Sequence, residues 1–148
     1  MSIYADRIKT LQSLMKKKSL SLFIIPSFDI HLSEYPAECF LQRQYISGFK
    51  GSAGTLLVFL KEAFLISDGR YEIQMKKELK DSNIQGIVST DFTTFLKEKL
   101  KNNSIIGIDF KKLSMHQAIE LKKLVKSKNS KLKNIDLVDE IWTDKPLL

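Results

Sequence analysis

A glycine-rich segment at residues 44–54 constrains the fold of this chain more than any other feature. It reads Gln-Tyr-Ile-Ser-Gly-Phe-Lys-Gly-Ser-Ala-Gly and holds three of the protein's six glycines. Glycine permits positive φ and close backbone approach, so residues 48–54 of this segment predict a loop of defined geometry entering a sheet. Two apolar runs follow at residues 55–60 and 63–66, and they predict an antiparallel hairpin. An Asp-Gly-Arg-Tyr motif, residues 68–71, comes directly after it.

The rest of the chain alternates between helical and strand-like patterns. Residues 27–42 are polar and rich in turn formers, and are predicted to be a loop. In the last long helix, Met115, Ala118, Leu121 and Val125 are expected to face inward. The alternation predicts an α/β fold, a mixed sheet of about six strands with helices on its faces. Helices are predicted over residues 3–18, 70–79, 92–100 and 114–125, and further strands over 20–25, 84–88, 105–108 and 132–138.

The composition is that of one globular domain. With 148 residues, 43% of them hydrophobic and 28% charged, the chain can bury a sizeable core. No apolar run approaches the roughly 18 residues that span a bilayer, and residues 1–7 do not resemble a signal peptide. The single cysteine, Cys39, excludes an internal disulfide and suits a reducing compartment. We therefore expect a cytoplasmic protein with no membrane partner.

The net charge of +7 raises the question of a nucleic-acid partner. Residues 1–70 carry +3 of this charge and residues 71–148 carry +4, so the charge is spread along the chain. The cations are lysines except for three arginines, although phosphate and base recognition favours arginine. Solvated lysine faces explain the charge, and no nucleic-acid partner is expected.

No constellation in the chain assembles a catalytic or metal centre. His31 and Glu34 could supply two metal ligands, but no third is placed near them, whereas catalytic zinc needs about three protein ligands. The second histidine, His116, is predicted to lie on a helix surface. Residues 48–54 have GxxGxxG spacing, but a strand follows them and the Lys-Ser/Thr pair of a phosphate-binding loop is missing. Neither Cys39 nor the serines of residues 44–54 have the context of a nucleophile.

Arg70 is the one side chain that backbone architecture does not explain. Asp68 is well placed to cap the following helix, and Glu72 in the first turn favours the helix dipole. A cation in that same turn opposes the dipole. Arg70 is therefore expected to pair with a carboxylate on this chain, on a neighbour or on a ligand. Tyr71 is expected to be a core or interface residue.

Several separated motifs follow one another in order over nearly the whole chain. They are Ile25-Pro26-Ser27 with Asp29, His31 and Ser33-Glu34-Tyr35; Arg43 with residues 45–49 and 51–54; residues 67–71 with Gln74; and Ile141-Trp142 with Asp144 and Pro146. This series resembles the N-terminal domain of the three-domain Xaa-Pro aminopeptidases (aminopeptidase P), in the creatinase/prolidase group. Ser67 stands where that pattern usually has threonine, and Lys145 where it usually has arginine.

The resemblance implies a non-catalytic domain of a metal-dependent enzyme that removes an N-terminal residue preceding proline. The metal ligands of this family, which hold two divalent ions, usually manganese, lie in a C-terminal catalytic domain that this chain lacks, so no cofactor is expected here. A fold similar to ribonuclease H in outline is implied, as are three partners: a peptide with proline at its second position, the protein's own catalytic domain, and a second subunit in the full-length homodimer. Arg70 matches the family's peptide-binding arginine. The remaining motif residues, including 33–35 and 48–54, are assigned to the loop scaffold.

The expected organisation is an N-terminal domain over residues 1–138 and the start of a linker over residues 139–148. An alternative stays open at this point, a free-standing module that binds peptide or nucleic acid without hydrolase activity. Reading the gene beyond Leu148 distinguishes the two. A second domain with degenerate metal ligands is a further alternative.

Overall fold

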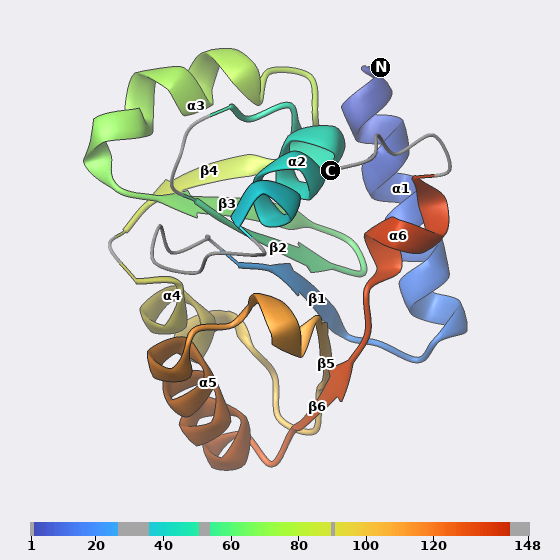
Figure 1. Cartoon of the computed structure of the whole chain (residues 1–148), viewed down its shortest axis with the longest axis vertical. Helices are drawn as coiled ribbons and strands as arrows, with labels where there is room; N and C mark the ends of the chain where they lie inside the picture. Colours follow the sequence, from blue (N-terminus) through green and yellow to red (C-terminus); the bar gives the residue numbers. More distant parts are fainter. Residues whose placement is uncertain (1, 27–35, 51–53, 90, 143–148) are drawn as a thin grey trace.

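The protein folds as a six-stranded mixed sheet between two layers of helices (Figure 1). The computed structural model describes residues 2–26, 36–50, 54–89 and 91–142, with the side chains of the second range described from Leu41 onward. The strand order is β4-β3-β2-β1-β5-β6. The strands are β1 (Leu22–Ile25), β2 (Thr55–Phe59), β3 (Ala63–Ser67), β4 (Gln85–Val88), β5 (Ile105–Ile108) and β6 (Lys131–Asn134).

Strand β2 runs against the other strands. It pairs antiparallel with β1 on one side and with β3 on the other, with Ile25 opposite Leu56 and Thr55 opposite Ile66. The pairs β3–β4, β1–β5 and β5–β6 are parallel. The predicted hairpin and mixed sheet are therefore confirmed.

Helices cover both faces of the sheet because the central strands carry apolar side chains on both. Phe23 and Ile25 of β1 join one buried cluster, whereas Leu22 and Ile24 join the other. On the first face lie α1 (Ile3–Lys17), α2 (Pro36–Ser47), α3 (Glu72–Glu78) and α6 (Leu137–Ile141). On the second face lie α4 (Phe92–Lys99) and α5 (Met115–Ser127).

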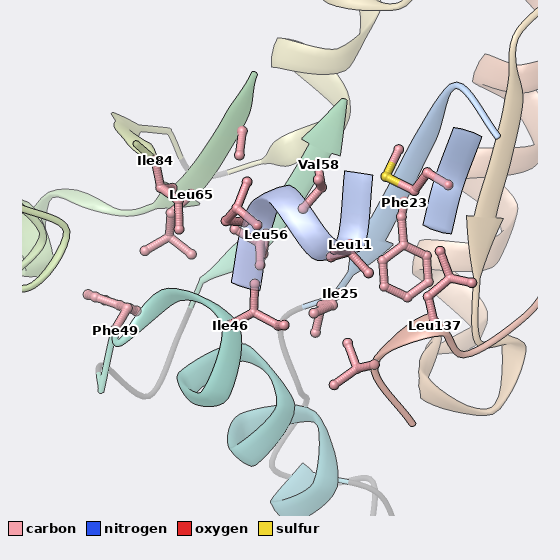
Figure 2. Packing of buried hydrophobic residues seen from close by; sticks show 14 of the residues in the cluster. Leu11, Phe23, Ile25, Ile46, Phe49, Leu56, Val58, Leu65, Ile84 and Leu137 are labelled. Carbon is pink, nitrogen blue, oxygen red and sulfur yellow. The ribbon is translucent and has the colours of Figure 1, made fainter. Parts of the chain in front are cut away.

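The first cluster joins elements that lie far apart in the sequence. Side chains from α1, α2, α6 and the central strands gather in it, and Phe49, just beyond α2, extends it toward β3 (Figure 2). The labelled members include Leu11, Phe23, Ile25, Ile46, Leu56, Val58 and Leu137. Motif residues at the end of α2 are thus anchored in the core.

The predicted loop over residues 27–42 is wrong from Pro36 onward, where α2 begins; residues 27–35 lie outside the described residues. Proline is compatible with the first turn of a helix, where its missing N–H needs no partner. The helix escaped detection because it buries polar residues. Gln42, Arg43 and Ser47 are each at most 1% exposed, so the helix lacks an apolar stripe.

Two further expectations need correction. The predicted strand over residues 132–138 ends at Asn134, because Asp136 accepts a hydrogen bond from the Asp139 N–H at 3.2 Å and caps α6. Met115 does not face inward but is 81% exposed. It is the first residue of α5, and the buried side chains of that helix come from its later turns.

Candidate functional site

The motifs meet at the carboxyl edge of the sheet, where the parallel strands end. Because β1, β3, β4, β5 and β6 run in the same direction, the segments that follow them emerge together, beside the segment that enters β2. Such carboxyl edges are where open α/β sheets commonly bind ligands. This edge is formed by Pro26 after β1, Gly54 before β2, residues 68–71 after β3, Ser89 after β4, residues 109–112 after β5 and residues 135–136 after β6.

Arg70 lies at this edge, in a 3-10 turn (Gly69–Tyr71) that leads into α3. Its carboxylate partner is on the same chain. The Asp68 carboxylate accepts from the Arg70 backbone N–H at 3.0 Å, from Nε at 3.0 Å and from Nη2 at 2.8 Å. The predicted cap by Asp68 and the predicted pairing of Arg70 with a carboxylate are both confirmed. The Arg70 side chain is 72% exposed and that of Asp68 27% exposed, so the pair presents its cation to solvent.

The pair also sets its own charge state. Hydrogen bonds from the Arg70 side chain and backbone lower the pKa of Asp68 below its usual value. The hydrogen bond to the Asp68 carboxylate likewise raises the pKa of Arg70. Both groups are therefore charged at neutral pH, and the edge presents an oriented guanidinium.

An aromatic pair fixes the turn that carries Arg70. The Tyr71 ring meets the Phe49 ring edge to face, with centroids 5.9 Å apart. The buried Arg43 guanidinium lies 5.2 Å from the centre of the Phe49 ring and donates from Nη1 to the Gly54 carbonyl at 2.8 Å. A Cβ on Gly54 would lie 3.3 Å from Phe49, so a larger residue would crowd that ring. Tyr71 is thus packed in the scaffold, as expected.

Hydrogen bonds at the surface also connect the glycine-rich segment to the motif that carries Arg70. Glu78, at the end of α3, accepts from the Lys50 backbone N–H at 3.0 Å and from Gln74 Nε2 at 2.7 Å. Gln74 belongs to the motif that begins at residue 67, and Lys50 to the glycine-rich segment. The glycine-rich segment and the Arg70 turn therefore form one connected unit.

The closing motif packs onto the glycine-rich motif. The Trp142 ring stacks on Tyr45 with centroids 4.4 Å apart and an interplanar angle of 16°. The Arg7 guanidinium carbon lies 3.8 Å from the Tyr45 ring centre, and Nη1 donates to the Tyr45 carbonyl at 2.6 Å. The end of the described chain is thus held against α1 and α2.

Sequence reasoning missed a buried charged cluster at the same edge. Lys112 is 2% exposed, and its Nζ donates to Gln42 Oε1 at 2.6 Å and to Asp136 Oδ2 at 3.1 Å, with Asp109 Oδ2 at 3.4 Å. Gln42 Nε2 also donates to Asp136 Oδ2 at 2.8 Å. Burial by itself would raise the pKa of Asp136, but the Lys112 charge and these hydrogen bonds outweigh it and lower the pKa. The cluster ties α2, β5 and the start of α6 together.

The remaining candidate residues of the sequence are His31, Glu34, Cys39 and His116. His31 and Glu34 lie outside the described residues, and Cys39 lies within α2. His116 is exposed on α5, as predicted. Within the described ranges, no three His, Cys, Asp or Glu residues are grouped so as to hold a metal ion. None of the described helices has the length and apolar character needed to cross a membrane.

The fold and the edge together define an α/β domain that presents one exposed, oriented arginine on a connected motif scaffold. The chain belongs to the creatinase/prolidase N-terminal domain family, whose model matches residues 7–141. The resemblance found in the motifs is thereby confirmed.

Similar proteins are several times longer than this chain. A probable Xaa-Pro aminopeptidase P of Talaromyces marneffei is 38% identical over 151 residues, which cover 95% of this chain and 22% of that protein. Aminopeptidase P2 of Arabidopsis thaliana is 37% identical, over 94% of this chain and 21% of that protein. The chain thus spans about a fifth of the length of these relatives.

Solved structures agree with the fold. The X-prolyl aminopeptidase of Caenorhabditis elegans, described as a cytosolic enzyme with a di-nuclear active site, superposes with a TM-score of 0.84 at 27% identity. The match covers all of this chain and 27% of that one. The N-terminal domain of the peptidase PepQ from Mycobacterium tuberculosis has the same fold, with a TM-score of 0.72 at 22% identity over 92% of this chain and 98% of that one.

Proposed function

We propose that this chain is the non-catalytic N-terminal domain of a cytoplasmic Xaa-Pro aminopeptidase, which limits access to the active site and helps to bind the peptide. The observation that carries the proposal is the exposed Arg70 guanidinium, oriented by Asp68 at the edge where the family motifs meet. In this proposal, residues 1–138 form the domain and residues 139–148 begin the linker. The divalent metal ions, manganese in the first instance, belong to the catalytic domain that follows.

The geometry of Arg70 allows a peptide to bind its guanidinium beside Asp68 or in place of Asp68. Asp68 accepts from Nε and Nη2, and within the described residues no acceptor is placed on Nη1. An arginine can donate through several N–H groups at once, so a peptide carbonyl or carboxylate can bind beside Asp68 or in its place. Because the pair is exposed, displacing Asp68 costs little desolvation.

Arg70→Ala in the full-length enzyme is expected to lower kcat/KM for Xaa-Pro peptides roughly ten- to hundredfold, the usual effect of losing a hydrogen bond to a charged group. Metal content is expected to stay unchanged, since Arg70 binds no metal in this proposal. The matched control is Lys122→Ala, which removes another exposed cation from α5. Arg70→Lys should recover part of the loss, because it keeps the charge but not the planar fork. An unchanged kcat/KM for Arg70→Ala would refute the assigned role.

The 148-residue chain alone is expected not to hydrolyse Xaa-Pro peptides with added manganese, because the proposal places the metal ligands in the domain that follows. Product release from a Xaa-Pro dipeptide or tripeptide, followed by chromatography, measures this. The full-length enzyme at equal concentration is the positive control. Metal-dependent turnover by the isolated chain would contradict the proposal. The proposed function includes no nucleic-acid partner. It includes a homodimer of the full-length enzyme.

A further inference from the structure

The two edge strands of the sheet differ in charge. Strand β6, at one edge, carries the exposed Lys131 and Lys133, and lysines on an edge strand disfavour pairing with another chain. Strand β4, at the opposite edge, contains no charged residue, and its Val88 is 49% exposed. The β4 edge therefore lacks the protection that the β6 edge has.

The backbone of β4 offers hydrogen-bonding groups on its open side. The Ser89 N–H donates to the Ser67 carbonyl of β3 at 2.8 Å, so the backbone groups of Ser89 point toward β3. Backbone groups of successive strand residues point to opposite sides, so those of Gly86 and Val88 face away from β3. Gly86 is exposed, and no side chain of its own shields its peptide groups.

Helix α3 lies beside this strand and runs against it, as the connection between the parallel strands β3 and β4 requires. Met75 packs over Gly86, where a Cβ would lie 3.2 Å from its side chain. A groove of about 210 Å³ lies between the two elements. Its apolar lining comes from Met75, Leu79, Ile84, Gly86 and Val88, and its charged lining from Glu72, Lys76 and Lys80.

The two ends of this groove carry charges of opposite sign. Glu72 opens α3 beside the Val88 end of β4, and Lys80 follows α3 at the Ile84 end. Both side chains are exposed, and neither has an ion-pair partner within the described residues. A surface with this arrangement is complementary to itself when it is rotated by half a turn.

We propose that β4 pairs antiparallel with β4 of a second copy of this chain, about a two-fold axis through Gly86. The two sheets then become continuous, Val88 of each copy lies opposite Ile84 of the other, and the α3 helices lie antiparallel on one face. Glu72 of each copy meets Lys80 of the other at both ends of the interface. Lys76 lies near the axis, where its exposed ammonium extends into water. This inference concerns the β4 edge alone and does not depend on the proposed function.

The oligomeric state of the 148-residue chain tests the proposal. Light scattering and analytical ultracentrifugation from micromolar to sub-millimolar concentration are expected to show a monomer–dimer equilibrium. Val88→Lys is expected to give a monomer throughout, because it places a charge on the pairing strand. The matched control Met115→Lys changes an exposed side chain on α5, across the sheet, and should leave the dimer intact. A wild-type monomer at every concentration, or a dimer that survives Val88→Lys, overturns the proposal.

A charge exchange tests the register. Glu72→Lys and Lys80→Glu are each expected to weaken the homodimer roughly tenfold, since each sets like charges opposite one another at both ends. Mixed in equal amounts, the two variants should associate more tightly than either alone, because the heterodimer restores opposite charges at both ends. Native mass spectrometry of variants with different masses reports the heterodimer fraction. A statistical mixture would rule out this register. Circular dichroism spectra of each variant that match the wild type show that the monomer fold is intact.

Discussion

Replacing Lys112 with alanine is expected to lower the free energy of unfolding by about 3 kcal/mol, because it leaves two partly buried carboxylates without their buried cation. Lys112 Nζ lies 3.1 Å from Asp136 Oδ2 and 3.4 Å from Asp109 Oδ2, and both carboxylates are about 20% exposed. Gln42 also loses the donor that reaches its Oε1 at 2.6 Å. Urea unfolding of the purified chain, followed by circular dichroism, measures the loss.

The neighbouring lysine supplies a matched control. Lys111 lies beside Lys112 in a 3-10 turn (Phe110–Lys112) but is exposed, and its contact with Asp109 runs through the backbone N–H, which alanine keeps. Lys111→Ala should therefore change stability by less than about 0.5 kcal/mol. Equal losses for the two variants would show that the buried cluster contributes nothing specific.

The pH dependence of the Lys112 effect has a definite sign. In the wild-type protein the folded pKa of Asp136 is lowered, so its contribution is present above the unfolded value of about 3.9 and is lost as pH falls through the folded pKa. In Lys112→Met the charge and the hydrogen bond of Lys112 are gone, so the pKa of Asp136 moves up from its lowered wild-type value. The stability gap between the two proteins should thus be widest near neutral pH and narrow under acid conditions. Lys112→Met with Asp136→Asn should recover part of the neutral-pH loss, because it removes both charges of the pair.

The sequence predicted the parts of the fold that depend on local patterns. A strand was predicted at each of the six positions, although the last was extended too far, and the turn between residues 59 and 63 predicted the pairing of β2 with β3. At the site, the position of Asp68 after a strand predicted its role as a cap, and the misfit of Arg70 with the helix dipole predicted a carboxylate partner. In each case the deciding residues are neighbours in the sequence.

The features that escaped prediction depend on residues far apart in the sequence. Lys112 stands next to Lys111 in a run that looks solvated, and only the approach of Gln42, 70 positions away, shows that it is buried. The same long-range packing explains α2, whose Arg43 faces Gly54 and Phe49 instead of water. Arginine and glutamine in a helix predict an exposed face, and the sequence carries no signal that the rest of the domain covers them.

Substituting alanine for Gly48 is expected to destabilise the protein by about 3 kcal/mol, for two separable reasons. Gly48 follows α2 with φ of +76°, a left-handed conformation that costs an L-residue about 1–2 kcal/mol. A Cβ there would also lie 2.8 Å from Tyr4 Cε2, so the Tyr4 ring or the loop must move. Thermal and urea unfolding of the variant measure the sum of the two effects.

A double-mutant cycle separates the two causes. Tyr4→Ala removes the ring that the new Cβ meets, so the cost of Gly48→Ala in that background should fall to the backbone part alone, about 1–2 kcal/mol. Gly69 in the other motif is the matched control: it has no positive φ, and the nearest atom to an added Cβ is Val88 Cγ1 at 3.9 Å. Gly69→Ala should therefore change stability by less than about 0.5 kcal/mol. If the Gly48 and Gly69 variants are equally stable, the glycine-rich segment does not depend on the left-handed backbone conformation of Gly48.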